Sequence, residues 1–205
     1  MPAKNSIKIY SENSYYHLYN RGVEKRLIFQ DEQDYAVFLS YLKTYLLPKD
    51  EKILKQKLAD PSTSYKIRET ILQQLKLNNF YGEITLIAYC LMPNHFHLLV
   101  KQKSNSSIDK FMNSLGIRYA MYFNRRYKRV GALYQDVYKA VIIESDPQLL
   151  YLTSYIHRNP INNTASKVDP FRGYFSQPSS LPEYLGQRKT RWVHPEDILV
   201  FFSKE

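Results

Sequence analysis

Two histidines separated by a single residue, His95 and His97, form the pattern with the clearest chemical meaning in this sequence. On a β-strand, side chains two positions apart point to the same side and lie about 6.5 to 7 Å apart along the backbone. Two neutral imidazoles placed in this way can bind one first-row divalent metal ion. A structural pair of half-buried histidines in a sheet has the same spacing, so the pattern alone leaves both interpretations open.

A second chemical pattern recurs every three or four residues between positions 148 and 159. If this segment is helical, its polar members share one side of the helix: Gln148, Tyr151, Tyr155 and Asn159. A tyrosine phenol, with an ordinary pKa of about 10, needs a metal or a general base to become a good nucleophile, but it can form covalent intermediates. Asn159 could offer its amide oxygen to the same metal. Amphipathic packing with incidental tyrosines is the alternative.

The chain is strongly basic, which favours polyanionic partners, nucleic acid first among them. Its 29 lysines and arginines outnumber its 19 aspartates and glutamates, for a net charge of +10. Basic groups interleaved with tyrosines suit a nucleic-acid strand, because the charges follow the phosphates and the rings stack on bases. We expect nucleic-acid contacts from Arg21, Arg118, Arg125, Arg126, Lys128, Arg129 and Lys139. A solvated run of charges is the alternative.

The hydrophobic pattern predicts the scaffold that must position these residues. Strand-like segments lie at 15–22, 84–92, 95–100 and 137–143, and helical periodicity begins after Asp31, Ser106 and Asp146. The third of these helices should end at Asn159, because a proline disfavours helical geometry in the residue before it. This order predicts an α+β fold, a ferredoxin-like or RRM-like palm with a mostly antiparallel sheet and helices on one face. The lysine-rich segment at about 48–80 is predicted to be an inserted helical hairpin.

Composition excludes several classes of protein. With 205 residues, 44% of them hydrophobic and 23% charged, the chain is neither wholly disordered nor fibrous. It has no run of roughly 18 to 20 apolar residues that could cross a membrane and no apolar stretch typical of a signal peptide near its start. The single cysteine, Cys90, cannot form an internal disulfide. We therefore expect a cytoplasmic protein with no membrane partner.

Four segments in order resemble one known family. They read YHLYNRG at 16–22, MPNHFHLL at 92–99, GALYQ at 131–135 and YIHRNP at 155–160. The set is similar to the REP-associated tyrosine transposases, relatives of the single-tyrosine HUH insertion-sequence transposases. The resemblance covers about 14–165 apart from the insertion. It implies a catalytic domain at 1–165. The remaining residues, 166–205, are predicted from the sequence pattern to form a loop-rich C-terminal tail with a short helix near 195–202.

The resemblance implies a metal-dependent endonuclease and strand transferase that acts on single-stranded DNA, often at palindromic hairpins. His95 and His97 match the family's metal ligands, Tyr155 the nucleophile, and Asn159 the polar side chain that completes the metal site. Attack by Tyr155 would give a 5′-phosphotyrosine intermediate and a free 3′-hydroxyl. The cofactor would be Mg²⁺ or Mn²⁺, and two nitrogen ligands favour Mn²⁺. Monomeric and dimeric forms both fit this scheme.

Some assignments have competitors. Tyr151 could attack in place of Tyr155, although it lies farther from Asn159 and does not match the family pattern. His17 is a secondary candidate, either as a DNA contact beside the site or as a sheet histidine, whereas we expect His157 at the surface or as a cap. Two functions compete with the transferase: a non-catalytic RRM-like binder of single strands, and a phosphodiesterase that uses activated water. The segment 174–178 departs from the family's usual tryptophan-serine-serine-tyrosine run, so no tail contacts are inferred.

Overall fold

The protein is built around one four-stranded antiparallel sheet with strand order β2-β3-β1-β4. The computed structural model describes residues 8–164 and 177–202, with the backbone alone for 161–164. The strands are β1 (Tyr15–Arg21), β2 (Ile84–Met92), β3 (His95–Gln102) and β4 (Lys139–Ile143). Strands β2 and β3 form a hairpin across residues 93 and 94, as predicted, and β1 pairs with both β3 and β4. A short 3₁₀ turn, Val23–Lys25, follows β1.

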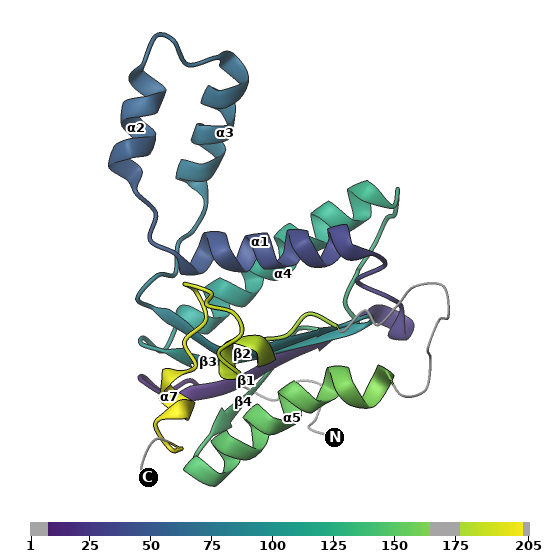
Figure 1. The fold of residues 1–205 in the computed structure, drawn as a ribbon. Coiled ribbons are helices and arrows are strands. Elements are labelled where there is room, and N and C mark those ends of the chain that lie inside the picture. Colours follow the sequence, from purple (N-terminus) through teal and green to yellow (C-terminus); the bar gives the residue numbers. More distant parts are fainter. Residues whose placement is uncertain (1–7, 165–176, 203–205) are drawn as a thin grey trace.

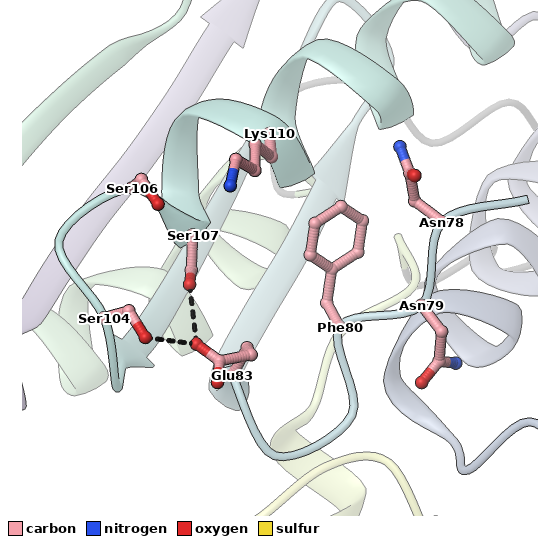
Figure 2. Close-up of a pocket in the computed structure, with 8 residues that line it drawn as sticks. All are labelled: Asn78, Asn79, Phe80, Glu83, Ser104, Ser106, Ser107 and Lys110. Carbon is pink, nitrogen blue, oxygen red and sulfur yellow. Dashed lines mark hydrogen bonds between the residues drawn. The ribbon is translucent and has the colours of Figure 1, made fainter.

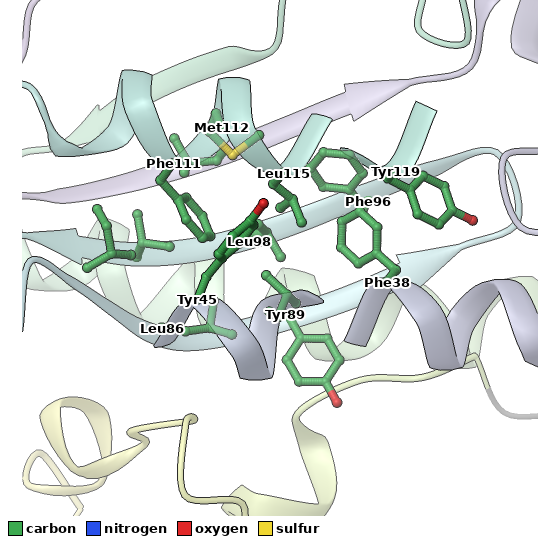
Figure 3. Packing of buried hydrophobic residues seen from close by; sticks show 14 of the residues in the cluster. Phe38, Tyr45, Leu86, Tyr89, Phe96, Leu98, Phe111, Met112, Leu115 and Tyr119 are labelled. Atoms are coloured by element: carbon green, nitrogen blue, oxygen red, sulfur yellow. The ribbon is translucent and has the colours of Figure 1, made fainter. Parts of the chain in front are cut away.

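One face of the sheet is covered by α1 (Glu32–Leu46) and α4 (Ser107–Arg126) (Figure 1). Asp31 caps α1 by accepting a hydrogen bond from the Asp34 amide, as the sequence indicated. Figure 3 shows how aromatic side chains fill this core. The Phe38 ring lies 5.2 Å from that of Phe96 on β3 and meets the Tyr119 ring edge-on at 5.1 Å. This core fixes β3 with Phe96 inward, and therefore with His95 and His97 on the opposite face.

The second face is covered by α5 (Asp146–Thr164), which corrects part of the prediction (Figure 1). The α+β class and the antiparallel sheet are confirmed, but the helices lie on both faces. Leu149, Leu152 and Ile156 of α5 pack with buried residues of β2 and β3, including Cys90 and Leu99. The reason is visible in β2, whose run ITLIAYCLM is apolar on both sides and needs a cover on each.

Helix α5 also continues past the predicted end at Asn159. Pro160 lies inside the helix, which runs to Thr164. A proline removes one backbone donor and crowds the preceding turn, but it does not forbid the helix from continuing. Asn159 and Tyr155 are therefore both held within a continuous helix.

The insertion forms the predicted helical hairpin, α2 (Glu51–Ala59) and α3 (Tyr65–Lys76). It projects from the body as an arm between the end of α1 and the start of β2 (Figure 1). Arg68 closes the turn of the hairpin, because its guanidinium donates to the Thr63 carbonyl at 2.9 Å and to the Leu58 carbonyl at 2.8 Å.

The segment 177–202 packs on the outer edge of β2. The Leu91 amide donates to the Pro178 carbonyl and the His194 amide to the Leu86 carbonyl, each at 2.9 Å. This segment contains α7 (Glu196–Leu199), which agrees with the predicted terminal helix, and α6 (Leu181–Tyr184), which the sequence did not indicate. Residues 174–176, part of the segment 174–178 that differs from the family's usual sequence, lie outside the described residues. Within the described part of the chain, no helix is long and apolar enough to span a membrane.

Candidate active site

Strand β3 brings His95 and His97 together on the face covered by α5. Their ring centroids are 5.0 Å apart and the rings are almost perpendicular. The rings converge because their strand alternates and because Phe96 and Leu98 are anchored in the opposite core. The convergence expected from the spacing is therefore present in the folded chain.

Each of these histidines has its Nδ1 atom engaged. The His95 Nδ1 lies 2.6 Å from the amide oxygen of Asn94, which can only accept, so this nitrogen carries the proton. The His97 Nδ1 lies 2.8 Å from the Nε2 of His17. His97 is 6% exposed, and its Nε2 is buried without a hydrogen-bond partner among the described residues. An unpartnered imidazole nitrogen of this kind suits a metal ion.

Burial keeps these imidazoles neutral. Desolvation, with smaller effects from His17 and His95, lowers the pKa of His97 to about 3. Desolvation and the nearby Arg21 lower the pKa of His95 to about 4. Both rings are consequently unprotonated at pH 7, which is the form that binds a metal.

Helix α5 places Tyr155 next to this pair. Its ring meets the His97 ring edge-on, with centroids 5.6 Å apart, and the side chain is 42% exposed. Tyr151, one turn earlier, is 74% exposed. Of the two tyrosines, Tyr155 is the one whose ring touches a histidine of the pair, and it is open enough to meet a strand of nucleic acid.

Asn159 follows Tyr155 by one turn and its amide nitrogen donates to the Tyr155 carbonyl at 2.9 Å. Its amide oxygen is the atom that could serve as a metal ligand. Both residues line a hollow of about 300 Å³ together with Tyr151, Ser154 and Arg158. Within the described residues, no group of three or more His, Cys, Asp or Glu side chains is arranged to hold a metal.

Three side chains of β1 share this face. Arg21 is paired in register with His95, and its Nε is buried without a partner among the residues described. The Tyr19 ring lies 5.7 Å from the His97 ring and 4.8 Å from the His17 ring, measured between centroids. Sequence analysis did not propose Tyr19, although its alternation with His17 and Arg21 was a usable signal.

The basic residues expected to contact nucleic acid lie in separate parts of the structure. Lys139 on β4 is paired in register with Tyr19 at the site and contacts Asp136 at 3.4 Å. Arg125 and Lys128 are exposed at the end of α4, and the guanidinium of Arg129 donates to Asn124 nearby. Because α4 covers the other face of the sheet, these three residues do not join the histidines.

Two residues predicted to contact nucleic acid, Arg118 and Arg126, also bind groups within the fold. The Arg118 guanidinium lies 3.8 Å from the centre of the Tyr41 ring, between α4 and α1. Arg126 forms ion pairs with Asp31 at 2.6 Å and with the fully buried Asp34 at 2.7 Å. A sequence pattern shows a cluster of charges but not the distant carboxylates and rings that bind them, so for these two residues the structure shows a role in the fold, and their contact with nucleic acid stays a prediction.

His157 is buried, whereas the sequence indicated a surface or capping residue. Its Nε2 lies 2.9 Å from the Ser180 hydroxyl and its ring packs on Tyr184, so it joins α5 to the segment on β2. The lowered pKa of His157, about 4, has desolvation as its main cause. It is a structural contact rather than part of the site.

A larger hollow of about 390 Å³ lies at the start of α4, away from the histidines. Figure 2 shows Glu83 at its base, where the carboxylate accepts hydrogen bonds from Ser104 at 2.6 Å and Ser107 at 2.9 Å. These bonds lower the pKa of Glu83. The carboxylate stabilises the N-terminal end of α4, so this hollow is explained by the fold.

Comparison with known proteins links the chain to one group. The family model described as "Transposase IS200 like" matches residues 53–159, more than half of the chain. A solved structure of a REP-associated tyrosine transposase bound to a REP hairpin is similar in fold, with a TM-score of 0.50 and 9% identity over 94% of this chain and 98% of that one. A putative transposase from Deinococcus radiodurans R1 has 18% identity and a TM-score of 0.31 over 75% of this chain and 96% of that one. No curated protein matches the chain.

Proposed function

The chain belongs to the family of IS200-like transposases, and from this premise we propose that it cuts and rejoins single-stranded DNA through a covalent bond to Tyr155. The observation that carries the proposal is the position of Tyr155. Its half-exposed ring touches His97, whose buried Nε2 has no partner among the residues described. The proposed nucleophile and a nitrogen suited to binding a metal therefore lie side by side.

The proposed reaction is a transfer of the phosphoryl group. The phenol oxygen of Tyr155 loses its proton and attacks the scissile phosphorus, the bond from phosphorus to the 3′ oxygen breaks, and that oxygen takes up a proton. The products are a 5′-phosphotyrosine and a free 3′-hydroxyl. A later attack by a DNA hydroxyl reverses the step, and the covalent intermediate conserves the energy needed for rejoining.

The donor set fits a divalent cation. His95 and His97 would bind it through their Nε2 atoms and Asn159 through its amide oxygen, with Mg²⁺ or Mn²⁺ as the ion. When bound, the cation would polarise the scissile phosphate and offset the charge that develops on it. The neutral imidazoles support this assignment, because no proton has to be displaced at pH 7.

DNA contacts are assigned to the side chains around the histidines. The buried Nε of Arg21, beside His95, has no partner in the described part of the chain, and Arg21 suits the scissile phosphate. Lys139, on the neighbouring strand β4, suits a second phosphate. Tyr19 offers a ring on which a base can stack. Arg125 and Lys128 would meet more distant phosphates. Because the solved relative of similar fold is bound to a REP hairpin, we propose a hairpin-forming single strand as the substrate.

We assign catalysis to residues 1–165 and a bracing role to the C-terminal tail. Trp192 of the tail stacks on Tyr89 with ring centroids 5.7 Å apart, and Ile198 is buried with the α5 residues that face the sheet. The tail would therefore hold β2 and α5 in place beneath the site.

The decisive test is a denaturing gel. Purified protein is incubated with hairpin single strands labelled at the 5′ or 3′ end, with Mn²⁺, with Mg²⁺ or with EDTA. We expect a metal-dependent covalent protein–DNA band that is lost in Tyr155→Phe and kept in the matched Tyr151→Phe. Cleavage without an adduct would indicate activated water, and binding without cleavage across many hairpins would indicate an RRM-like binder.

A further inference from the structure

A third histidine, His17, contacts the proposed metal ligand His97 from a different strand. The two rings stack with centroids 4.9 Å apart and planes 27° apart, and a hydrogen bond of 2.8 Å joins the His17 Nε2 to the His97 Nδ1. In the β1–β3 register, His97 faces Tyr19 and His17 faces Leu99, so His17 is a diagonal neighbour on the same side of the sheet.

We propose that His17 is a positioning residue that holds His97 in the tautomer able to bind the metal, an inference that rests on the proposed function. One proton lies between the two nitrogens, and there are two ways to place it. If His17 donates, the His97 Nε2 carries a proton, and this buried N–H has no acceptor among the described residues. If His97 donates from Nδ1, its Nε2 presents a lone pair.

The chemistry of the proposed site favours the second arrangement. In both, the His97 Nε2 is buried without a partner among the described residues, but only in the second does it present the lone pair that a metal ion needs. The second moves the remaining proton to the His17 Nδ1. His17 is only partly buried, and its Nδ1 is not among the buried unpaired atoms of the described residues, so this proton can be hydrated.

The neighbouring ligand shows the same design. The Asn94 amide oxygen accepts from the His95 Nδ1 at 2.6 Å, which leaves the His95 Nε2 as the lone-pair nitrogen. Metal-binding histidines in proteins usually donate their other ring N–H to a fixed acceptor, which sets the tautomer and the ring orientation. Here Asn94 does this for His95 and His17 does it for His97. The His17 Nε2 is already bound to His97, so this atom is not itself a third ligand.

The test measures Mn²⁺ affinity by titration calorimetry without DNA, on the whole chain. His17→Leu removes the acceptor, and loss of such a partner typically weakens metal binding about 10- to 100-fold. His17→Gln places an amide oxygen where the His17 Nε2 lies, so it should restore affinity close to that of the unmodified protein. Circular dichroism and melting curves of both variants establish that they are folded.

A second readout follows the tautomer directly. In ¹⁵N-histidine spectra of the metal-free protein, we expect His97 to carry its proton on Nδ1, and we expect this signature to weaken in His17→Leu and return in His17→Gln. Equal Mn²⁺ affinity in His17→Leu and the unmodified protein would overturn the role of His17, as would a loss that Gln does not rescue. If His97→Ala also binds Mn²⁺ normally, the proposed metal site itself is wrong.

Discussion

Replacing Ile156 by alanine should destabilise the protein and disturb the site at the same time. Ile156 is 0% exposed and lies in the apolar cluster between α5 and the sheet, with Cys90 and Leu99. The change removes three carbons, worth about 0.8 kcal/mol each by transfer, and leaves a cavity that adds to the loss. We expect the free energy of unfolding to fall by about 3 to 4 kcal/mol, a large part of the roughly 5 to 15 kcal/mol typical of a domain.

The effect should extend to the covalent reaction, because Tyr155 directly precedes Ile156 on the helix. A shift of about 1 Å in a reacting group can cost on the order of 100-fold in rate. We therefore expect Ile156→Ala to form the protein–DNA adduct more slowly at a temperature where circular dichroism shows it to be folded.

Urea unfolding followed by circular dichroism measures the stability, with two controls. Ile156→Val removes one carbon and should cost about 0.5 to 1.5 kcal/mol. Tyr151→Ala, on the exposed side of the same helix, should change the free energy of unfolding by less than about 0.5 kcal/mol. A loss below about 1 kcal/mol in Ile156→Ala would refute the claim that this side chain anchors α5 to the sheet.

Three further results are expected. Ser107→Ala should lower stability at neutral pH but not in acid, as measured by urea unfolding from pH 7 to pH 3. The lowered pKa of Glu83 means that its carboxylate stabilises the fold above the ordinary pKa of a glutamate, and this stabilisation is lost as the pH falls through the pKa in the folded state. An equal loss of stability at every pH would contradict this reasoning. Arg21→Ala should abolish adduct formation, followed on a gel, with limited loss of hairpin binding, followed by fluorescence anisotropy. Arg125→Ala should only weaken hairpin binding and reduce its salt dependence. Similar behaviour of the two variants would count against a position of Arg21 at the scissile phosphate. Replacing residues 50–76 by a short glycine-serine linker should leave the melting temperature nearly unchanged, because this arm packs mainly on itself; a chain that no longer folds would show that the arm supports the core.

Local patterns were enough for the elements and for part of the site. Strand alternation around Phe96 placed His95 and His97 on one side, and the three-and-four spacing of α5 placed Tyr155 near Asn159. The inserted hairpin also followed from spacing and from its proline-containing turn. These features depend on residues within a few turns of one another, so a period of 2 or 3.6 is sufficient to predict them.

Contacts between distant segments were not accessible in this way. Arg126 lies 95 positions from Asp31 in the chain, and nothing local to the basic run indicates that its charge is bound by carboxylates. The local sequence of His157 is typical of a surface residue, and its contact with Ser180, 23 positions later, depends on the tertiary fold. The placement of α5 on the second face depends on how β2 is buried, which helical periodicity in α5 does not encode.

Sequence patterns identify the residues that could do chemistry: a histidine pair on a strand, a tyrosine and an asparagine one turn apart, and a surplus of positive charge. Which of these residues meet depends on how the chain packs. The strand order β2-β3-β1-β4 brings His17 within hydrogen-bonding distance of His97 across 80 positions of sequence, and α5 sets Tyr155 rather than Tyr151 against that ring. The physical reason is that strand pairing and helix docking are settled by burial of apolar surface over the whole chain, which no local spacing records.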